Sequence, residues 1–342
     1  QLIDKYLIPQ ELEKKSNAEV STPYKLRNEM LDKIPVEFWT VPNKVFEPCS
    51  GKGGFIIDII DRFMTGLKET IPNEKLRYKT IIEDCLYFSD INPTNIFICK
   101  LLIDPYNEYK LNYNEGNTLE LDITKWNIKG FDAVICNPPY QSNSGNKGRG
   151  NTLWDKFVVI TINTWLLQKG LMLYIHPCGW RQIDNKIGRL LLSKKIEYLN
   201  MNNVKEGLKI FKCSTTFDYY LIKNENVKKN YKTIINDYNN KEYNISLYNS
   251  KFIANHSHNL IQNMFDFNNT YGIIKYRSVY GTERSHISKN KTDEYKYPCV
   301  YSINKSNEIS KIWSRINTNG HFGVTKFILS NGCGYYKDIK GI

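Results

Sequence analysis

The chain has 342 residues, of which 47 are Lys or Arg and 35 are Asp or Glu, so its formal net charge is +12. Hydrophobic residues make up 41% of the sequence and aromatic residues 13%, which excludes a disordered or collagen-like chain because there is ample apolar surface to bury. No run approaches the roughly 18 uncharged apolar residues of a membrane-spanning helix, and residues 1–9 lack the apolar core of a signal peptide. The length predicts about two domains.

The chain begins with Gln1 rather than Met, so we expect a fragment or a processed form. Eight cysteines are spread along the sequence, and no two are closer than 14 residues. This spacing excludes the paired cysteines of a structural zinc site, and His256 and His258 have no acidic cluster beside them. The cysteines lie mostly among apolar residues, as free thiols in a reducing compartment do. We therefore predict a cytoplasmic protein that needs no metal.

Positive charge is concentrated toward the end of the chain. Residues 1–222 carry 29 basic and 26 acidic side chains, whereas residues 223–342 carry 18 basic and 9 acidic ones. A basic segment attached to a nearly neutral one indicates a polyanion partner, and nucleic acid is the usual one. The alternative is that lysine and asparagine are simply common in this chain.

In chain order, the pattern of apolar residues predicts helices over 23–34, 55–64, 93–103 and 154–168, and strands over 44–47, 80–88, 131–136 and 171–176. Such an alternation favours an α/β fold whose mainly parallel sheet has helices on both faces. Beyond about residue 222 the strands become short and are broken by Asn and Gly. We therefore expect a first domain over 1–222 and a second over 223–342.

Residues 47–55 read Glu-Pro-Cys-Ser-Gly-Lys-Gly-Gly-Phe and lie between a predicted strand and a predicted helix. The glycines let a ligand approach the backbone closely, beside free amide groups at the start of the helix. This turn is no phosphate-binding loop, because its Gly-Lys pair is followed by glycine rather than Ser or Thr. Glu47 would repel a pyrophosphate but could bind an ammonium or hydroxyl group. Asp90, at the end of the next strand, can accept hydrogen bonds from both ribose hydroxyls, so together the two features predict a nucleoside cofactor.

The strand predicted over 131–136 runs directly into Asn137-Pro138-Pro139-Tyr140. The two prolines remove amide donors and stiffen the turn, which leaves carbonyl oxygens exposed at the carboxyl end of the strand. The Asn137 side-chain oxygen and the Pro138 carbonyl could each accept a hydrogen from an exocyclic amino group, whose lone pair would then attack an activated methyl group. Tyr140 would stack on the ring that carries this amino group. The pattern predicts catalysis by positioning, without a covalent intermediate.

In these motifs the sequence resembles the S-adenosylmethionine-dependent amino-methyltransferases that act on adenine N6 of DNA, of the gamma type found among restriction-modification methylases. The resemblance implies a Rossmann-like methyltransferase fold, in which a mainly parallel seven-stranded sheet is flanked by helices and followed by a smaller target-recognition region. It implies methyl transfer from S-adenosylmethionine to an adenine flipped out of the duplex, with S-adenosylhomocysteine as product. The partners it implies are double-stranded DNA and a cognate restriction endonuclease, with no membrane.

The resemblance also assigns roles to single residues. Catalysis falls to the turn Asn137, Pro138, Pro139 and Tyr140. The residues expected to bind the cofactor are Thr22, Glu47, Pro48, Cys49, Gly51, Gly53, Phe55, Asp90, Ile91, Asn117 and Asn137. Asn117 stands where Asp is commoner. Tyr140 and Phe211 are expected to hold the target base between them, with Phe217 as the alternative to Phe211.

Contacts to the nucleic acid are expected from two basic regions. Lys147 and Arg149 lie in the polar segment that follows the catalytic turn, and Lys275, Arg277 and Arg284 lie in the second domain. Basic side chains of this kind contact phosphates rather than base edges. The family usually continues past the point where this chain stops, which again suggests truncation.

The sequence leaves other substrates open. RNA adenine methyltransferases and protein-glutamine methyltransferases use the same Asn-Pro-Pro-Tyr chemistry, and an inactive nucleic-acid-binding subunit would keep the same fold. The basic residues beyond 222 argue against a small enzyme acting on a protein amide. Asn rather than Ser at position 137 favours adenine N6 over cytosine N4.

Overall fold

In the computed structural model, the described residues are 20–141, 152–182, 185–258, 282, 284–303 and 309–318, together with Lys5 and Leu7. The chain divides into two compact units, Gln1–Asn263 and Met264–Ile342. The boundary expected at 222/223 falls inside a strand, Phe217–Asn226, of the first unit. Two further short strands beyond it also belong to that unit, so its sheet takes in residues that the sequence alone assigns to the second domain.

The first unit is built on a nine-stranded sheet with the order β3-β2-β1-β4-β5-β7-β6-β8-β9. Its strands are β1 (Val45–Glu47), β2 (Leu86–Asp90), β3 (Asn112–Glu115), β4 (Phe131–Cys136), β5 (Leu166–Pro177), β6 (Lys194–Asn202), β7 (Phe217–Asn226), β8 (Thr233–Asn236) and β9 (Glu242–Ile245). The strands from β3 to β5 pair in parallel, and β7 is antiparallel to both of its neighbours. The expected seven strands are thus extended by two, because β8 pairs with the free edge of β6.

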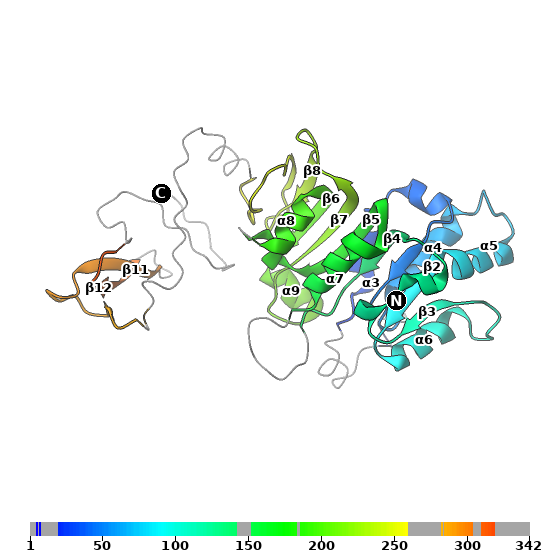
Figure 1. Cartoon of the computed structure of the whole chain (residues 1–342), viewed down its shortest axis with the longest axis horizontal. Helices are drawn as coiled ribbons and strands as arrows, with labels where there is room; N and C mark the ends of the chain where they lie inside the picture. Colours follow the sequence, from blue (N-terminus) through cyan, green and yellow to red (C-terminus); the bar gives the residue numbers. More distant parts are fainter. Residues whose placement is uncertain are drawn as a thin grey trace. The chain divides into compact units, whose positions relative to one another are not determined.

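Helices cover both faces of this sheet (Figure 1). The helices described are α3 (Tyr24–Leu31), α4 (Gly54–Gly66), α5 (Glu74–Thr80), α6 (Pro93–Ile103), α7 (Trp154–Ile160), α8 (Lys186–Leu192) and α9 (Val204–Phe211). Buried side chains of α3, α4 and α6 pack on one face, and those of α7 and α8 pack on the other. The α/β class expected from the alternation of elements and the Rossmann-like arrangement implied by the resemblance are therefore present.

Two segments differ from the elements that the sequence predicts. The strand expected from residue 80 begins only at Leu86, because Ile81–Cys85 form a π-helical turn continuing α5. The helix expected to end at residue 168 ends in a similar turn, Thr161–Trp165, and β5 begins at Leu166. Both turns bury apolar side chains, and a short apolar run cannot distinguish a buried strand from a buried helical segment.

The second unit contains a three-stranded antiparallel sheet with the order β10-β12-β11. Its strands are β10 (Ile287–Ser288), β11 (Tyr297–Ile303) and β12 (Ile309–Ser314). Lys291 lies over the ring of Trp313, with its Nζ 5.2 Å from the ring centroid. Ile312 is buried in this small sheet, which gives the unit an apolar centre of its own.

The parallel strands deliver several polar residues to one edge of the large sheet. Glu47, Asp90 and Glu115 are the last residues of β1, β2 and β3, and Asn137 directly follows β4. Because the carboxyl ends of parallel strands meet at one edge, these side chains are brought together by topology alone. This carboxyl edge is where ligands bind in open α/β sheets.

Candidate active site

The glycine turn after β1 is held by backbone contacts with the neighbouring strand. The Ser50 amide donates to the Ser89 carbonyl over 2.9 Å, and the Gly53 amide donates to the Ser50 carbonyl over 3.0 Å. Gly51 and Gly53 have φ angles of 50° and 80°, a left-handed conformation that glycine adopts without strain. The turn therefore needs glycine at these two positions, both of which were expected to approach the cofactor.

The Asp90 side chain is hydrogen-bonded to this turn. One carboxylate oxygen accepts a hydrogen bond from the Gly51 amide and the other accepts one from the Asn92 amide, each over 2.8 Å. Burial raises the pKa of Asp90, and these hydrogen bonds oppose the rise because they favour the charged form. Ile91 is exposed beside it, so an apolar surface adjoins the carboxylate.

Glu47 lies beneath the same turn and is only 2% exposed. Burial, with further contributions from Asp90 and Asp58, holds the pKa of Glu47 well above its usual range, while Arg27 acts in the opposite direction. Its Oε2 is buried and has no hydrogen-bond partner among the described residues. A buried carboxyl oxygen without a partner is expected where a bound ligand would donate the missing hydrogen bond.

In the turn Asn137–Tyr140, the side-chain amide of Asn137 is held in one orientation by two hydrogen bonds. Asn137 donates from Nδ2 to the Thr22 hydroxyl over 3.0 Å and to the Val20 carbonyl over 3.2 Å. Both amide hydrogens are thus used within the protein, and no described residue donates to the Asn137 Oδ1. The side chain therefore presents a hydrogen-bond acceptor at the carboxyl edge of the sheet.

Tyr140 is half-buried, and its hydroxyl is buried without a hydrogen-bond partner among the described residues. Burial raises the pKa of Tyr140, so the phenol stays neutral. The Leu153 amide donates to the Tyr140 carbonyl over 3.2 Å, and Gln141 and Thr152 form an antiparallel bridge next to it. The intervening Lys147 and Arg149, expected to contact phosphates, lie outside the described residues.

The second aromatic residue of the site lies at the end of α9. Phe211 is half-buried and packs edge-on against Phe217, with ring centroids 4.9 Å apart. Phe217 itself is fully buried in the core, so of the two candidates Phe211 has the surface available for a ligand. The base-stacking role of Phe211 stays a prediction.

Asn117 is exposed, and its side chain is engaged locally. It accepts a hydrogen bond from the Leu119 amide over 3.2 Å and donates to Glu120 over 2.6 Å. These contacts cap the 3₁₀ turn Thr118–Glu120. A contact between Asn117 and the cofactor stays a prediction and would have to compete with this cap.

Three residues that the sequence did not single out support the site. The Thr118 hydroxyl donates to the Pro48 carbonyl over 2.9 Å and lies 2.7 Å from the Ser89 hydroxyl, which ties the ends of β1, β2 and β3 together. Arg27 on α3 pairs with Asp58 over 2.6 Å. A side-chain carbon placed on Gly54 would lie 2.9 Å from its guanidinium. The Cys99 thiol lies 3.4 Å from the Gly51 carbonyl.

Cys49 and Cys136 face one another at the ends of β1 and β4. The two thiols are close enough to influence each other, and burial raises the pKa of each. Both are free cysteines, and the floor of the turn is therefore a neutral, apolar surface. Pro48 is part of the same turn, and Phe55, buried on α4, packs into the core rather than facing the edge.

The basic residues expected in the second unit are only partly described. Arg284 is exposed, whereas Lys275 and Arg277 lie outside the described residues. Across the described ranges, no helix is both long and apolar enough to cross a membrane. Within the same ranges, no group of three His, Cys, Asp or Glu side chains is arranged to hold a metal ion.

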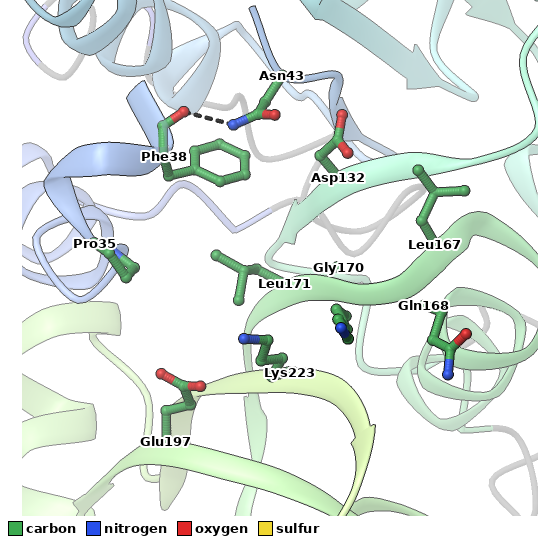
Figure 2. Close-up of a pocket in the computed structure, with 11 residues that line it drawn as sticks. Pro35, Phe38, Asn43, Asp132, Leu167, Gln168, Gly170, Leu171, Glu197 and Lys223 are labelled. Carbon is green, nitrogen blue, oxygen red and sulfur yellow. Dashed lines mark hydrogen bonds between the residues drawn. The ribbon is translucent and has the colours of Figure 1, made fainter. Parts of the chain in front are cut away.

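A cavity of about 360 Å³ opens at the opposite, amino edge of the sheet (Figure 2). Asp132, Glu197 and Lys223 line it, and these residues lie near the amino-edge ends of β4, β6 and β7. Asn137 follows the other end of β4, so the cavity is separate from the candidate active site.

The chain is similar to one protein family and to several solved structures. Residues 4–165 match the family model described as N-6 DNA Methylase. A modification subunit of a putative type I restriction enzyme from Vibrio vulnificus YJ016 is 12% identical, with a TM-score of 0.51 over 94% of this chain and 65% of that one. The M protein of the EcoKI Type I restriction enzyme is 15% identical, with a TM-score of 0.46 over 64% of this chain and 48% of that one.

A putative class I S-adenosylmethionine-dependent methyltransferase from Listeria monocytogenes is 12% identical, with a TM-score of 0.48 over 69% of this chain and 70% of that one. The chain spans about half to two thirds of the two restriction-enzyme subunits. No curated protein sequence matches it. The resemblance indicated by the glycine turn and the Asn-Pro-Pro-Tyr turn is thus supported: residues 4–165 match the N-6 DNA Methylase family model, and the chain has a Rossmann-like methyltransferase fold.

Proposed function

We propose that this protein is a site-specific DNA methyltransferase that transfers a methyl group from S-adenosylmethionine to N6 of adenine, as part of a restriction-modification or genome-marking system. The observation that carries the proposal is the orientation of Asn137. Its amide nitrogen is held by Thr22 and by the Val20 carbonyl, which leaves its Oδ1 to accept a hydrogen from a substrate amino group. The family match over residues 4–165 supports the same chemistry.

The residues around the glycine turn fit S-adenosylmethionine. The unpartnered Oε2 of Glu47 suits a donor such as the ammonium of the methionine moiety. Asp90 is held by two backbone amides and can still accept hydrogen bonds from ribose hydroxyls, because each carboxylate oxygen has two lone pairs. Exposed Ile91 would pack against the adenine ring. When bound, the cofactor supplies a methyl group on a positively charged sulfur.

Asn137 and Pro138 would act on the amino group of the target base. The nitrogen lone pair of an exocyclic amine is conjugated with the ring and is a poor nucleophile. Hydrogen bonds from that amine to the Asn137 Oδ1 and the Pro138 carbonyl would favour a tetrahedral nitrogen and localise its lone pair toward the methyl group. Preorganised acceptors of this kind need no reorganisation during the reaction.

The target adenine would be held between aromatic rings outside the duplex. Its amino group cannot be reached within the base stack, so the proposal includes flipping of the base into the pocket beside Tyr140. The neutral Tyr140 ring would stack on one face, and Phe211 would cover the other. The neighbouring Pro139 would keep the Tyr140 backbone stiff.

The proposal predicts that Asn137→Ala lowers methyl transfer by at least about 100-fold, the usual cost of losing one preorganised hydrogen bond to a reacting group. Cofactor affinity should stay within a few-fold, because Glu47, Asp90 and the glycine turn would supply most of the cofactor contacts and the contact expected of Asn137 would be one among several. The matched control is Asn230→Ala, which removes an exposed amide from the turn between β7 and β8. Transfer of labelled methyl groups to duplex DNA measures the first effect, and calorimetry with S-adenosylhomocysteine measures the second.

The substrate is tested by offering the parent protein duplex DNA, RNA and a protein with an exposed glutamine. Incorporation into DNA at adenine is expected. Incorporation into RNA or protein alone would replace DNA as the substrate while keeping the chemistry. A parent that binds cofactor but methylates none of the three would overturn the proposed function.

A further inference from the structure

We infer that the lysines of α9 and its C-cap, Lys205, Lys209 and Lys212, contact the phosphate backbone of the nucleic acid that flanks the target base. The inference rests on the proposed function and names a surface of the first unit through which the substrate would be held. This surface is distinct from the basic residues of the second unit.

Lys205 and Lys209 are four residues apart, a spacing that places both side chains on one face of the helix. Lys212 follows as the C-cap residue in a left-handed conformation, and all three lysines are exposed. Gly207 lies on the opposite face and is the one buried residue of α9. The helix therefore presents lysines outward and rests on the protein through its glycine.

Gly207 fixes the position of this helix closely. A side-chain carbon at Gly207 would lie only 2.0 Å from the Thr215 carbonyl oxygen and 3.3 Å from the Cys213 carbonyl oxygen. The helix is thus pressed against the segment 213–216, which leads into β7. Because a clash of this size involves backbone atoms, α9 can keep this position only with glycine here.

The helix lies at the same edge of the sheet as the catalytic turn. It follows directly after the carboxyl end of β6, and its last residue, Phe211, packs on Phe217 at the start of β7. Cys213 is near enough to Tyr140 that its charge would raise the Tyr140 pKa. A duplex with a base stacked on Tyr140 would therefore have adjoining phosphates in reach of this helix.

The charge of α9 suits a polyanion. Glu206 is its one acidic residue, and its contact with Lys209 is long, at 4.0 Å, and mostly exposed. Exposed pairs of this kind contribute little, so a phosphate could replace the carboxylate at low cost. The amides at the helix start are already used, since the Asn203 side chain accepts from the Lys205 and Glu206 amides. The positive charges that would meet phosphates are therefore those of the exposed lysine side chains.

The test replaces all three lysines with glutamine in the full chain and measures binding of a 20-base-pair adenine-containing DNA duplex at several salt concentrations. Removing one lysine from a phosphate should reduce the slope of log affinity against log salt by about 0.9, so we expect a reduction of about 2 to 3 for the triple variant. Cofactor affinity should be unchanged, because none of the three lysines faces the glycine turn. Arginine at the same three positions should restore the parent slope.

A matched control is Lys75→Gln with Lys79→Gln on α5, which leads into the amino edge of β2. These lysines are also exposed, and Lys79 also pairs weakly with a glutamate, Glu83, over 3.9 Å. Figure 1 shows α5 and α9 at opposite ends of the first unit. The control should leave the salt slope as it is in the parent.

An unchanged slope in the α9 variant, or an equal change in the α5 control, would overturn the inference. A parent that methylates DNA while the α9 variant binds DNA as the parent does would refute only the α9 surface. A parent that neither binds nor methylates DNA would refute the proposed function instead. Far-ultraviolet circular dichroism confirms that each variant is folded, and glutamine keeps the helix propensity of lysine.

Discussion

Glu47 is a buried carboxyl group with one oxygen left without a partner among the described residues. Two more carboxyl groups, those of Asp90 and Asp58, add to the effect of burial, so the pKa of Glu47 is held well above its usual range. A cation at the open oxygen would favour the ionised form. Ligand binding and loss of the Glu47 proton should therefore be coupled.

We expect the affinity for S-adenosylmethionine to fall as the pH is lowered through the raised pKa of Glu47, because protonation removes the charge that attracts the ammonium. Glu47→Gln should weaken binding by about 10- to 100-fold at high pH, as for loss of a hydrogen bond to a charged group. It should also remove most of the pH dependence. Calorimetric titration between pH 6 and pH 9, in steps of about one unit, measures both effects. A variant that keeps the full pH dependence would point to Asp90 instead.

Sequence analysis could find the site residues that end strands. Glu47, Asp90 and Asn137 each follow an apolar run, and parallel pairing then brings them to one edge. Thr22 was predicted only through the family resemblance and as a cofactor-binding residue, and its contact with Asn137 was not predicted. Arg27 and Thr118 were not predicted, because their roles arise from hydrogen bonds across elements that no local pattern encodes.

At the scale of elements, the close packing of α9 against the Thr215 carbonyl predicts that Gly207 cannot be replaced without a loss of stability. Gly207→Ala would push a methyl group into the Thr215 carbonyl and force the helix to shift, at a cost of about 1 to 3 kcal/mol in unfolding free energy. DNA binding should weaken with it, since the lysines move. The control is Gly179→Ala, where the added carbon meets no atom within 4 Å. Chemical denaturation of both variants checks the difference, and equal stability would mean that the helix accommodates the methyl group freely.

The elements predicted best are those with one consistent signal. The helix Pro93–Ile103 and the strand Phe131–Cys136 have the predicted bounds, because the first has an N-terminal Asn-Pro start and the second is a compact apolar run before prolines. The π-helical turns Ile81–Cys85 and Thr161–Trp165 were not predicted. Their apolar residues would suit a strand equally well. Whether such a run continues the preceding helix or begins the next strand depends on how far that helix extends, which the local sequence does not show.

At the scale of the whole molecule, positive charge is denser in the second unit. Residues 264–342 carry 12 basic and 6 acidic side chains, a net +6, which is half of the charge of the chain on less than a quarter of its length. A unit of this composition would hold a polyanion without regard to base sequence. Recognition of a target would then depend on other side chains.

We expect the combined replacement of Lys275, Arg277 and Arg284 by glutamine to weaken binding of all DNA duplexes to a similar degree. Phosphate contacts carry no base information, so target and scrambled duplexes should lose affinity alike, and the salt slope should fall by about 0.9 for each phosphate that is no longer neutralised. Competition between the two duplexes measures this directly. A loss of affinity confined to the target duplex would assign these residues to base recognition.

The contact between Asn137 and Thr22 joins residues that are 115 positions apart. The Asn137 amide is therefore not oriented by its own turn alone, and a chain starting after Pro23 would keep every strand of the large sheet while releasing this side chain to rotate. Because the segment before α3 closes this contact across the folded sheet, we expect it to form late in folding. Catalytic competence would then be gained after the fold itself, in a separate and removable step.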